Sequence, residues 1–349
     1  MDILVTGGNG LLGQHLIPAL EARGDTVRVL ALPTENTDAL ERRGTTVVRG
    51  DITQSQTLAS ATAGVEAVLH LAGMMGVWRP IGDYHAVNVK GTENVCRAAL
   101  AAGVRRVVHV SSWTVYRMAW DTPAREDFLP RPFPEPYAIT KAAGDACVQQ
   151  MVVDERLPAV IVRPGTFFGP GDRLHFKRMA DRVAAGRALI VGRGGNALPF
   201  IYVTDVVQGL LRALDCEEAI GQAYNISNDQ PLTQQEFLEA IAEELGAAPP
   251  RIHIPYRALY AAGYLAERAA TVTRSRKQPV LTRLGVKLFG TDNRHSIAKA
   301  RRQLGFEPEV SLREGVRLSA NWYRQQASYQ PAARRFVASP TALPGARRR

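Results

Sequence analysis

Tyr137 and Lys141 stand four residues apart in the stretch YAITK. If this stretch is helical, their side chains lie on one face of the helix, one turn apart. A free phenol has a pKa of about 10, and we expect the nearby ammonium to favour the phenolate and lower the pKa of Tyr137. Such a phenol can pass a proton to or from a substrate oxygen. The spacing therefore predicts acid–base chemistry, with an exposed polar pair on a helix surface as the alternative.

A second chemical feature is the stretch TGGNGLLG, which follows a short apolar run and precedes a helical pattern. In such a turn Gly7 suits the tight bend, Gly10 lets the main chain approach a pyrophosphate, and Gly13 lets the helix pack closely on the strand. Leu11 and Leu12 begin the helix, whose N-terminus would face the anion. We predict a dinucleotide site, because the glycines join the first strand to the first helix. A purely structural turn is the alternative.

The end of the second strand usually distinguishes NAD from NADP, through an acid for the ribose hydroxyls or an arginine for the extra phosphate. In VRVLALPTEN this position falls on Ala31 or Leu32, so neither signal is present. Glu35 follows shortly and could contact a ribose. We expect NAD or NADP as the cofactor, with NAD slightly favoured because no Arg or Lys follows the strand closely.

These residues need a scaffold to position them, and the first half of the chain predicts one. Short apolar runs such as DILVTG, TVRVLAL, AVLHLAG and RVVHVSS alternate with longer helical patterns. This alternation is typical of βαβ units in a parallel sheet that is covered on both faces. We therefore predict an α/β fold, a Rossmann-like doubly wound parallel sheet with a smaller, mostly helical, discontinuous substrate lobe.

The division of the chain follows from where this rhythm loosens, after Pro164. We predict a dinucleotide-binding core at 1–165, with 196–226 returning to it. The substrate lobe is predicted at 166–195 and 227–328, and a basic, disordered tail at 329–349.

The lobe contains one segment with a marked helical pattern, YRALYAAGYLAERAATV. Its apolar and aromatic residues recur at helical spacing, at Tyr256, Leu259, Tyr260, Gly263 and Tyr264. A helix of this kind could pack into the core, close the substrate pocket or rest against a membrane surface.

The 349 residues carry a net charge of +10 that is unevenly distributed. Residues 251–349 hold 20 of the 43 Lys and Arg but only 5 of the 33 Asp and Glu. No interleaved aromatic residues or binding motif accompany these cations, so we expect no nucleic-acid partner. A solvated face is the simplest interpretation, and weak contact with an anionic membrane surface is the alternative. The apolar runs are too short to cross a bilayer, and no signal peptide is apparent, so we expect a cytoplasmic protein.

Three cysteines, Cys96, Cys147 and Cys216, are far apart and lack a CxxC or neighbouring histidine. This pattern predicts free thiols, with neither a disulfide framework nor a metal site.

Taken together, the motifs resemble the extended short-chain dehydrogenase/reductase family, which holds NAD-dependent epimerases, dehydratases and 3β-hydroxysteroid dehydrogenase-like enzymes. The resemblance covers about residues 1–325 and depends on eight landmarks in family order. They are TGGNGLLG, GDIT with Asp51, HLAG from His70, NVKGTENV from Asn88, VSSWTVY with Ser112, YAITK, RPGTFFGPGD from Arg163, and YVTDVVQGLLRAL from Tyr202.

The resemblance implies a role for each landmark. Ser112, Tyr137 and Lys141 would be catalytic, with Lys141 also holding the nicotinamide ribose and Ser112 binding the substrate oxygen. The cofactor would also be bordered by Asp51 and Ile52 at the adenine, by Leu71, Ala72 and Gly73, and by Pro164 at the nicotinamide. Asn88 would either support the active-site backbone or cap the helix that it opens. His70 is expected to be a core histidine.

The branch of the family is indicated by what replaces the sugar-nucleotide signature. The nucleotide-sugar enzymes resemble one another in having an Asn and an Arg that bind the diphosphate. This chain has Thr166 and Leu198 at the corresponding positions. Instead, HLAG is followed by Met74, Met75, Val77 and Trp78, and the Gly-Val-Trp in this stretch, followed by a Tyr and NVKGT, is similar to the 3β-hydroxysteroid dehydrogenase branch. We expect these residues to form an apolar pocket wall, with Trp113 and Tyr116 nearby, and core packing is the alternative.

The resulting hypothesis is an NAD(P)-dependent oxidoreductase that interconverts a secondary alcohol and a ketone on an apolar, steroid-like or long-chain substrate. One alternative is an NAD-dependent nucleotide-sugar epimerase or dehydratase. A second is a non-catalytic nucleotide-sensing protein on the same fold. The expected partner is a small apolar molecule, and a homodimer is left open.

Overall fold

The computed structural model describes residues 1–118, 121–273, 275 and 277–326. Within them, seven parallel strands form one sheet in the order β10-β6-β5-β4-β1-β2-β3. These strands are β1 (Asp2–Thr6), β2 (Thr26–Ala31), β3 (Thr46–Arg49), β4 (Ala67–His70), β5 (Arg106–Val110), β6 (Ala159–Pro164) and β10 (Ala223–Ile226). The predicted doubly wound parallel sheet is confirmed.

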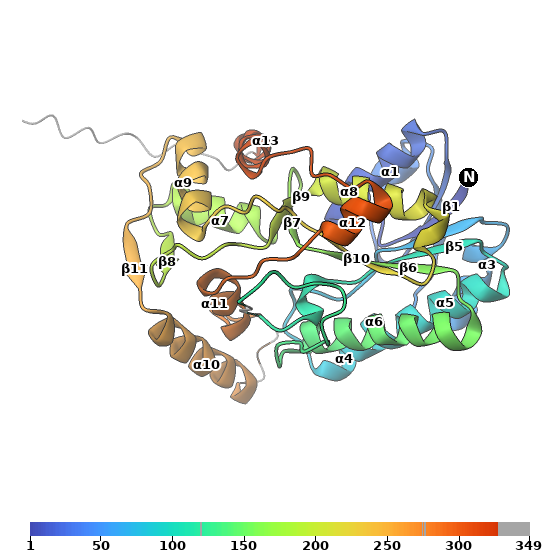
Figure 1. The fold of residues 1–349 in the computed structure, drawn as a ribbon, viewed down its shortest axis with the longest axis horizontal. Coiled ribbons are helices and arrows are strands. Elements are labelled where there is room, and N and C mark those ends of the chain that lie inside the picture. The colour runs from blue at the N-terminus through green and yellow to red at the C-terminus, as the bar shows by residue number, and fades with distance from the viewer. Residues whose placement is uncertain (119–120, 274, 276, 327–349) are drawn as a thin grey trace, which may run out of the picture.

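Helices cover both faces of this sheet (Figure 1). On one face lie α1 (Leu11–Ala22) and α8 (Val203–Asp215), and on the other lie α3 (Leu58–Thr62), α5 (Thr92–Ala101) and α6 (Pro136–Glu155). Side chains alternate along each strand, so Ile3 and Val5 join one core and Leu4 joins the other. Two hydrophobic cores therefore hold the sheet between two helical layers.

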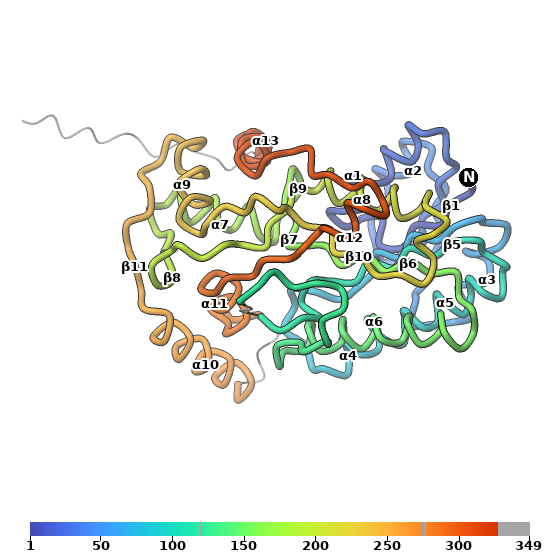
Figure 2. Tube along the Cα trace, viewed as in Figure 1, coloured from blue at the N-terminus to red at the C-terminus, as the bar shows by residue number. Residues whose placement is uncertain are grey.

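The remaining elements are mostly helical and lie beyond the carboxyl ends of β6 and β10 (Figure 1). The helices are α7 (Phe176–Ala184), α9 (Gln234–Leu245), α10 (Tyr256–Val272), α11 (Arg283–Gly290) and α13 (Leu312–Gln325). Two short parallel pairs join them, β7 (Thr166–Phe168) with β9 (Phe200–Tyr202) and β8 (Leu189–Val191) with β11 (Ile252–Ile254). The tube in Figure 2 shows that α9 and α13 lie side by side, although they are far apart in the chain.

One segment of the predicted lobe contacts the sheet instead. Helix α12 (Ala298–Leu304) lies beside β10, where Lys299 Nζ donates to the carbonyl oxygen of Ala223 (3.0 Å) and the Tyr224 hydroxyl donates to Gln303 Oε1 (3.0 Å). The lobe boundaries at 166–195 and 227–328 stay a prediction, and the tail at 329–349 lies outside the described residues.

Several shorter elements connect these helices and strands. They are α2 (Asp38–Glu41), α4 (Ile81–His85), a π-helical turn at Ala86–Gly91, and 3-10 turns at Ser55–Thr57, Trp113–Val115 and Glu217–Ala219.

The three cysteines are free thiols, of which Cys96 is buried.

Candidate active site

The glycine turn joins β1 to α1 as predicted, and its glycines differ in what requires them. Gly7 has a φ of +73°, and a Cβ there would lie 2.8 Å from the backbone nitrogen of Ala72. At Gly13 a Cβ would lie 2.3 Å from the carbonyl oxygen of Gly8. Both positions therefore need glycine for the fold itself.

Gly10 serves a different purpose in this turn. It is exposed, and the nearest atom to a Cβ there would be the carbonyl oxygen of Gly7 at 3.2 Å. It is the N-cap of α1 and brings no capping side chain, so the first amides of α1, those of Leu11 and Leu12, have no acceptor from the cap. Such an open helix N-terminus fits the pyrophosphate of a dinucleotide.

The loop after β2 borders the same turn. Asn9 Nδ2 donates to Glu35 Oε2 and to the carbonyl oxygen of Asn36, both at 3.2 Å. Arg49, at the end of β3, donates to the carbonyl oxygens of Leu32 (3.3 Å) and Glu35 (2.8 Å). The acid held beside the glycine turn is thus Glu35, which lies four residues beyond the end of β2 at Ala31.

The predicted adenine-bordering pair lies just after β3. Asp51 Oδ1 accepts from the backbone nitrogen and the hydroxyl of Thr53, both at 2.8 Å. Ile52 is 7% exposed and packs against Gly91, and its carbonyl oxygen accepts from Asn94 Nδ2 (2.9 Å). Both residues therefore shape the turn, and their contact with adenine stays a prediction.

The YAITK stretch is helical, so Tyr137 and Lys141 share one face of α6 as predicted. Pro136 begins the helix, and the Glu135 carboxylate accepts from the backbone nitrogens of Tyr137 (3.1 Å) and Ala138 (3.3 Å). Glu135 was not predicted from the sequence, although an acid followed by proline is a recognisable helix start. This cap fixes the position at which Tyr137 enters the site.

The structure brings Ser112, Tyr137 and Lys141 together. Ser112 follows β5 at the start of a 3-10 turn, where its Oγ accepts from the hydroxyl of Thr114 (2.9 Å). It is also hydrogen-bonded to the Tyr137 side chain. Lys141 is 5% exposed, and its ammonium donates to the carbonyl oxygen of Val110 at 2.7 Å. Helix α6 and strand β5 thus meet at the predicted catalytic set.

The pKa of Tyr137 differs in direction from the one expected from the sequence. Burial raises the pKa of Tyr137 to about 12, and the hydrogen bond with Ser112 only partly opposes this rise. Burial also lowers the pKa of Lys141 to about 8, against an opposing effect of Asp145. The predicted lowering of the Tyr137 pKa by Lys141 is wrong for this structure, because desolvation of the phenolate is the largest effect and Lys141 is not among the groups that shift this pKa. At neutral pH the phenol keeps its proton.

Asn88 supports the loop that follows β4. It lies inside the π-helical turn between α4 and α5, so it opens no helix and the capping alternative is wrong. Its Oδ1 accepts from the backbone nitrogen of Met74 (2.7 Å), and its Nδ2 donates to the carbonyl oxygen of Met74 (3.1 Å) and to Thr140 Oγ1 (3.0 Å). Asn88 thereby joins the loop containing Leu71, Ala72 and Gly73 to α6.

Gly73 leaves the space between this loop and the catalytic helix open. It is exposed, and a Cβ there would lie 3.3 Å from Asn88 Oδ1 and 3.9 Å from Lys141 Nζ. Lys141 therefore reaches the loop that follows β4 as well as the end of β5.

His70 is a core residue, as predicted. It is fully buried between Thr6 and Thr92, with ring nitrogens 2.7 Å and 3.1 Å from their hydroxyl oxygens. Burial lowers its pKa to about 3, so the ring is neutral at physiological pH.

A buried ion pair behind the site was missed in the sequence. Asp145 lies four residues after Lys141 on the same face of α6, and this spacing was the available signal. Its carboxylate accepts from Arg163 Nε (2.9 Å) and Nη2 (2.8 Å) and from Ser111 Oγ (2.6 Å). The pair thus links α6 and β6 to the residue that precedes Ser112.

The expected apolar wall divides into exposed and core residues. Met75 and Val77 are 40% and 43% exposed, on the loop after β4. Trp113 is buried with Phe133 and Ala138, and Tyr116 is fully buried with its hydroxyl donating to Asn225 Oδ1 (2.8 Å). Core packing, the alternative interpretation, therefore holds for Trp113 and Tyr116.

The segment after β7 contacts both α1 and the loop after β4, which was not predicted. A ring nitrogen of His15 on α1 lies 2.9 Å from the carbonyl oxygen of Pro170. A Cβ on Gly76 would lie 2.9 Å from Leu174 Cδ2, so Leu174 packs against the loop after β4. Residues 170–174 therefore connect α1 to that loop.

The two positions that replace the sugar-nucleotide contacts carry neither an amide nor a guanidinium. The hydroxyl of Thr166, just after Pro164 and Gly165, accepts from the Trp113 indole nitrogen at 2.9 Å. Leu198 is 1% exposed. Both positions therefore lack the amide and the guanidinium of the nucleotide-sugar signature, and the Thr166 hydroxyl keeps one proton that it can donate.

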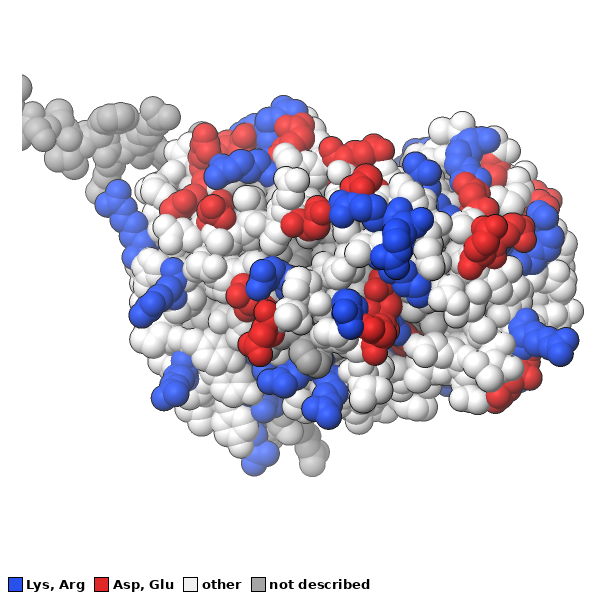
Figure 3. Space-filling view, viewed as in Figure 1, with Lys and Arg blue, Asp and Glu red and all other residues white. Residues whose placement is uncertain are grey.

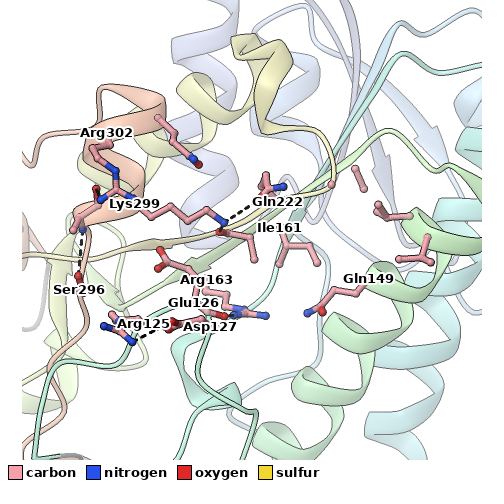
Figure 4. Close-up of a pocket in the computed structure, with 17 residues that line it drawn as sticks. Arg125, Glu126, Asp127, Gln149, Ile161, Arg163, Gln222, Ser296, Lys299 and Arg302 are labelled. Carbon is pink, nitrogen blue, oxygen red and sulfur yellow. Dashed lines mark hydrogen bonds and ion pairs between the residues drawn. The ribbon is translucent and has the colours of Figure 1, made fainter.

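A hollow of about 640 Å³ lies elsewhere, beside the edge strand β10 (Figure 4). Its charged side chains are already bonded to protein groups. Glu126 accepts from the backbone nitrogen of Asn225 (2.8 Å), Arg125 pairs with Asp127 (3.1 Å), and Lys299 donates to Gln222 (2.9 Å). These contacts cover the exposed edge of the sheet, as edge strands require.

Comparison with known proteins places this geometry in a family. The sequence model of the NAD-dependent epimerase/dehydratase family matches residues 3–227. A 2-alkyl-3-oxoalkanoate reductase of Stenotrophomonas maltophilia (strain K279a) is 35% identical, over 91% of this chain and 98% of its own length. A 3-beta-hydroxysteroid dehydrogenase of Mycolicibacterium neoaurum is 31% identical, over 90% of this chain and 89% of its own.

A solved structure agrees with these relatives. The UDP-glucose 4-epimerase of Thermus thermophilus in complex with NAD matches with a TM-score of 0.73 and 25% identity, over 93% of this chain and 100% of that one. The predicted resemblance to extended short-chain dehydrogenases/reductases, including 3β-hydroxysteroid dehydrogenases, is confirmed. The chain therefore belongs to the NAD-dependent epimerase/dehydratase family, as an enzyme that uses NAD or NADP.

Proposed function

We propose that this enzyme interconverts a ketone and a secondary alcohol on an apolar substrate with a long alkyl chain or a steroid-like ring system. The observation that carries the proposal is which side chains lie where the substrate would bind. Thr166, whose hydroxyl accepts from Trp113, and a buried Leu198 occupy the diphosphate positions, while Met75 and Val77 are exposed on the loop beside Lys141. Binding would then come mainly from apolar burial, at roughly 25 cal/mol per Å².

The proposed roles of the chain's own groups follow from their positions. A bound nicotinamide cofactor would supply or accept the hydride. Tyr137, protonated at neutral pH because burial raises its pKa to about 12, would donate its proton to the carbonyl oxygen of a ketone. Ser112, hydrogen-bonded to Tyr137, would hold the same oxygen. A protonated phenol favours the reductive direction near pH 7.

The residues that would hold the cofactor surround this set. Gly10 and the first amides of α1 would bind the pyrophosphate, and Lys141, which reaches towards Gly73, would hold the ribose beside the nicotinamide. Glu35, oriented by Asn9, would accept from the adenosine ribose hydroxyls. An acid at that place would disfavour an extra phosphate, so we propose NAD over NADP.

The names of the relatives support this substrate class. The 35% identical protein is named as a reductase of 2-alkyl-3-oxoalkanoates, and the 31% identical one as a dehydrogenase of 3β-hydroxysteroids. The runner-up is sugar-nucleotide epimerisation, which the similarity to a UDP-glucose 4-epimerase favours.

A competition assay tests the proposal. The purified enzyme is offered NADH or NADPH with long-chain 3-oxoalkanoates and 3-ketosteroids, and separately NAD with UDP- and dTDP-sugars. We expect oxidation of the reduced cofactor by the apolar ketones and no change in the sugars, and Tyr137→Phe is the control for adventitious turnover. Epimerisation or dehydration of a sugar nucleotide, without redox on the apolar set, would overturn the proposal.

A further inference from the structure

The outward face of α10 has an unusual composition for a surface helix. Leu265 and Val272 are 66% and 79% exposed, and Tyr264 is 45% exposed. At 100° per residue, Ala261, Leu265 and Val272 lie along the middle of the exposed side, opposite the buried Leu259, Gly263 and Ala270. A surface helix normally presents polar residues there. Here the strip farthest from the protein is apolar.

We propose that this outward face of α10, residues Arg257 to Val272, docks the enzyme on an anionic membrane surface. Helix α10 projects at the edge of the molecule (Figure 2), and among the described residues no other element covers its outward side. Its 17 residues are about 26 Å long at 1.5 Å per residue. Among the described residues, no helix has the length and apolar character needed to cross a bilayer. The helix would lie in the interface.

The charges around α10 point to an anionic partner. Between residues 251 and 291 the sequence has a single acid, Glu267, and eight Lys and Arg. Glu267 is buried and pairs with Arg283 at 2.6 Å, so it does not offset the exposed cations. Arg251, Arg257, Arg268 and Lys277 are exposed. In the space-filling view the surface over α10 is blue and white (Figure 3).

The arrangement of these cations suits lipid headgroups. Arg257 and Arg268 lie on one flank of the apolar strip, where long side chains can reach headgroups while Leu265 and Val272 enter the acyl boundary. Each such cation adds to the attraction towards an anionic surface.

A second copy of this chain is a poorer occupant of the same face. A twofold dimer places the same patch of each protomer against the other. Arg257 and Arg268 of the two copies would then approach each other, with no exposed acid on α10 to pair with them. The charge on this face therefore favours lipid over self-association.

Docking here would bring the active site close to the membrane. The inner side of α10 contributes Tyr260 to the cluster of Trp113, Phe133 and Ala138. Trp113 follows Ser112, and Ala138 follows Tyr137. Delivery of an apolar substrate from the bilayer would rest on the proposed function, whereas the docking itself depends only on this surface.

Vesicle cosedimentation of the full chain tests the proposal. We expect the protein to pellet with phosphatidylcholine vesicles containing about 30% phosphatidylglycerol, and much less with phosphatidylcholine alone or in about 0.5 M NaCl. The double variant Leu265→Glu/Val272→Glu should bind at least about tenfold more weakly, because it loses two inserting side chains and adds two negative charges.

The matched control is Val153→Glu, since Val153 is 76% exposed on α6, away from α10. It should bind vesicles like the wild type, and circular dichroism should show that all variants are folded. Equal binding by the double variant and the wild type would overturn the proposal. The proposal would also be overturned if the double variant bound vesicles like the wild type but had a different oligomeric mass in solution. This face would then be a contact between copies.

These variants distinguish a failure of the proposed membrane docking from a failure of the proposed function. Tyr137→Phe should lose turnover and keep vesicle binding. The double variant should lose vesicle binding and keep turnover of a short, water-soluble ketone.

Discussion

The ammonium of Lys141 donates to the carbonyl oxygen of Val110 at 2.7 Å. This bond fastens the catalytic helix α6 to the end of β5, two residues before Ser112. Because the ammonium is buried and held by a strand, its position does not depend on the Tyr137 phenol. The geometry of the catalytic set is therefore determined by the contact between a helix and a strand.

Tyr137→Phe should lower kcat by roughly two to four powers of ten, the usual scale for a positioned acid or base. The affinity for the cofactor should change little, because the phenol is proposed to act on the substrate oxygen. Steady-state kinetics and calorimetric titration with NAD and NADP measure the two quantities. Near-normal turnover would contradict the assignment.

Lys141→Met should abolish turnover and yet raise the unfolding temperature at pH 7. Burial lowers the Lys141 pKa from 10.5 to about 8, so folding at pH 7 buries a charge at a disadvantage of about 3 kcal/mol. Between pH 8 and 10.5 the unfolded chain binds a proton that the folded chain does not. This group therefore makes the free energy of unfolding rise with pH across that window.

The comparison with the wild type across this window is the decisive measurement. The stabilising effect of Lys141→Met should be full below pH 8 and should diminish towards pH 10.5. A variant that is less stable than the wild type at pH 7 would mean that the bond to Val110 outweighs desolvation.

Gly10→Val should abolish dinucleotide binding and leave the fold intact. The backbone angles of Gly10, φ −68° and ψ 167°, are open to valine, and a Cβ there would lie close only to the carbonyl oxygen of Gly7. The added side chain would occupy the space of the pyrophosphate. Calorimetry should show affinity at least about a hundredfold weaker, and unchanged affinity would make this turn structural.

The contrast is Gly13→Ala in the same turn. A Cβ at Gly13 would lie 2.3 Å from the carbonyl oxygen of Gly8, so this smaller change should destabilise the protein itself. Thermal unfolding of both variants separates the two roles of glycine.

Asn88→Ala should reduce the free energy of unfolding by about 2–4 kcal/mol, because buried partners on Met74 and Thr140 lose their hydrogen bonds. It should also raise the KM for the cofactor, since the loop with Gly73 loses its connection to α6. The control is Ser319→Ala, which loses one buried bond to the carbonyl oxygen of Gly315 in α13. Urea unfolding and kinetics should show a smaller loss of stability and an unchanged KM for the cofactor in the control.

Local patterns in the chain were enough to predict the fold and the shared helix face of Tyr137 and Lys141. The alternation of apolar runs and helical segments predicted the parallel sheet, because periodicity reflects which face of each element is buried. The glycines at 7, 10 and 13 and the spacing of Tyr137 and Lys141 predicted a nucleotide turn and a shared helix face. These signals are local, since the turn spans eight residues and the pair one helical turn.

What the sequence could not show depends on neighbours far apart in the chain. The Tyr137 pKa rises because folding partly removes the phenol from water, so one nearby lysine was a poor guide. Asn88 reaches Met74 and Thr140, and Asp145 reaches Ser111 and Arg163, across different elements. Trp113 and Leu265 are both apolar, yet one is buried and the other exposed. Only tertiary packing decides between these outcomes, because burial depends on every element that surrounds a side chain.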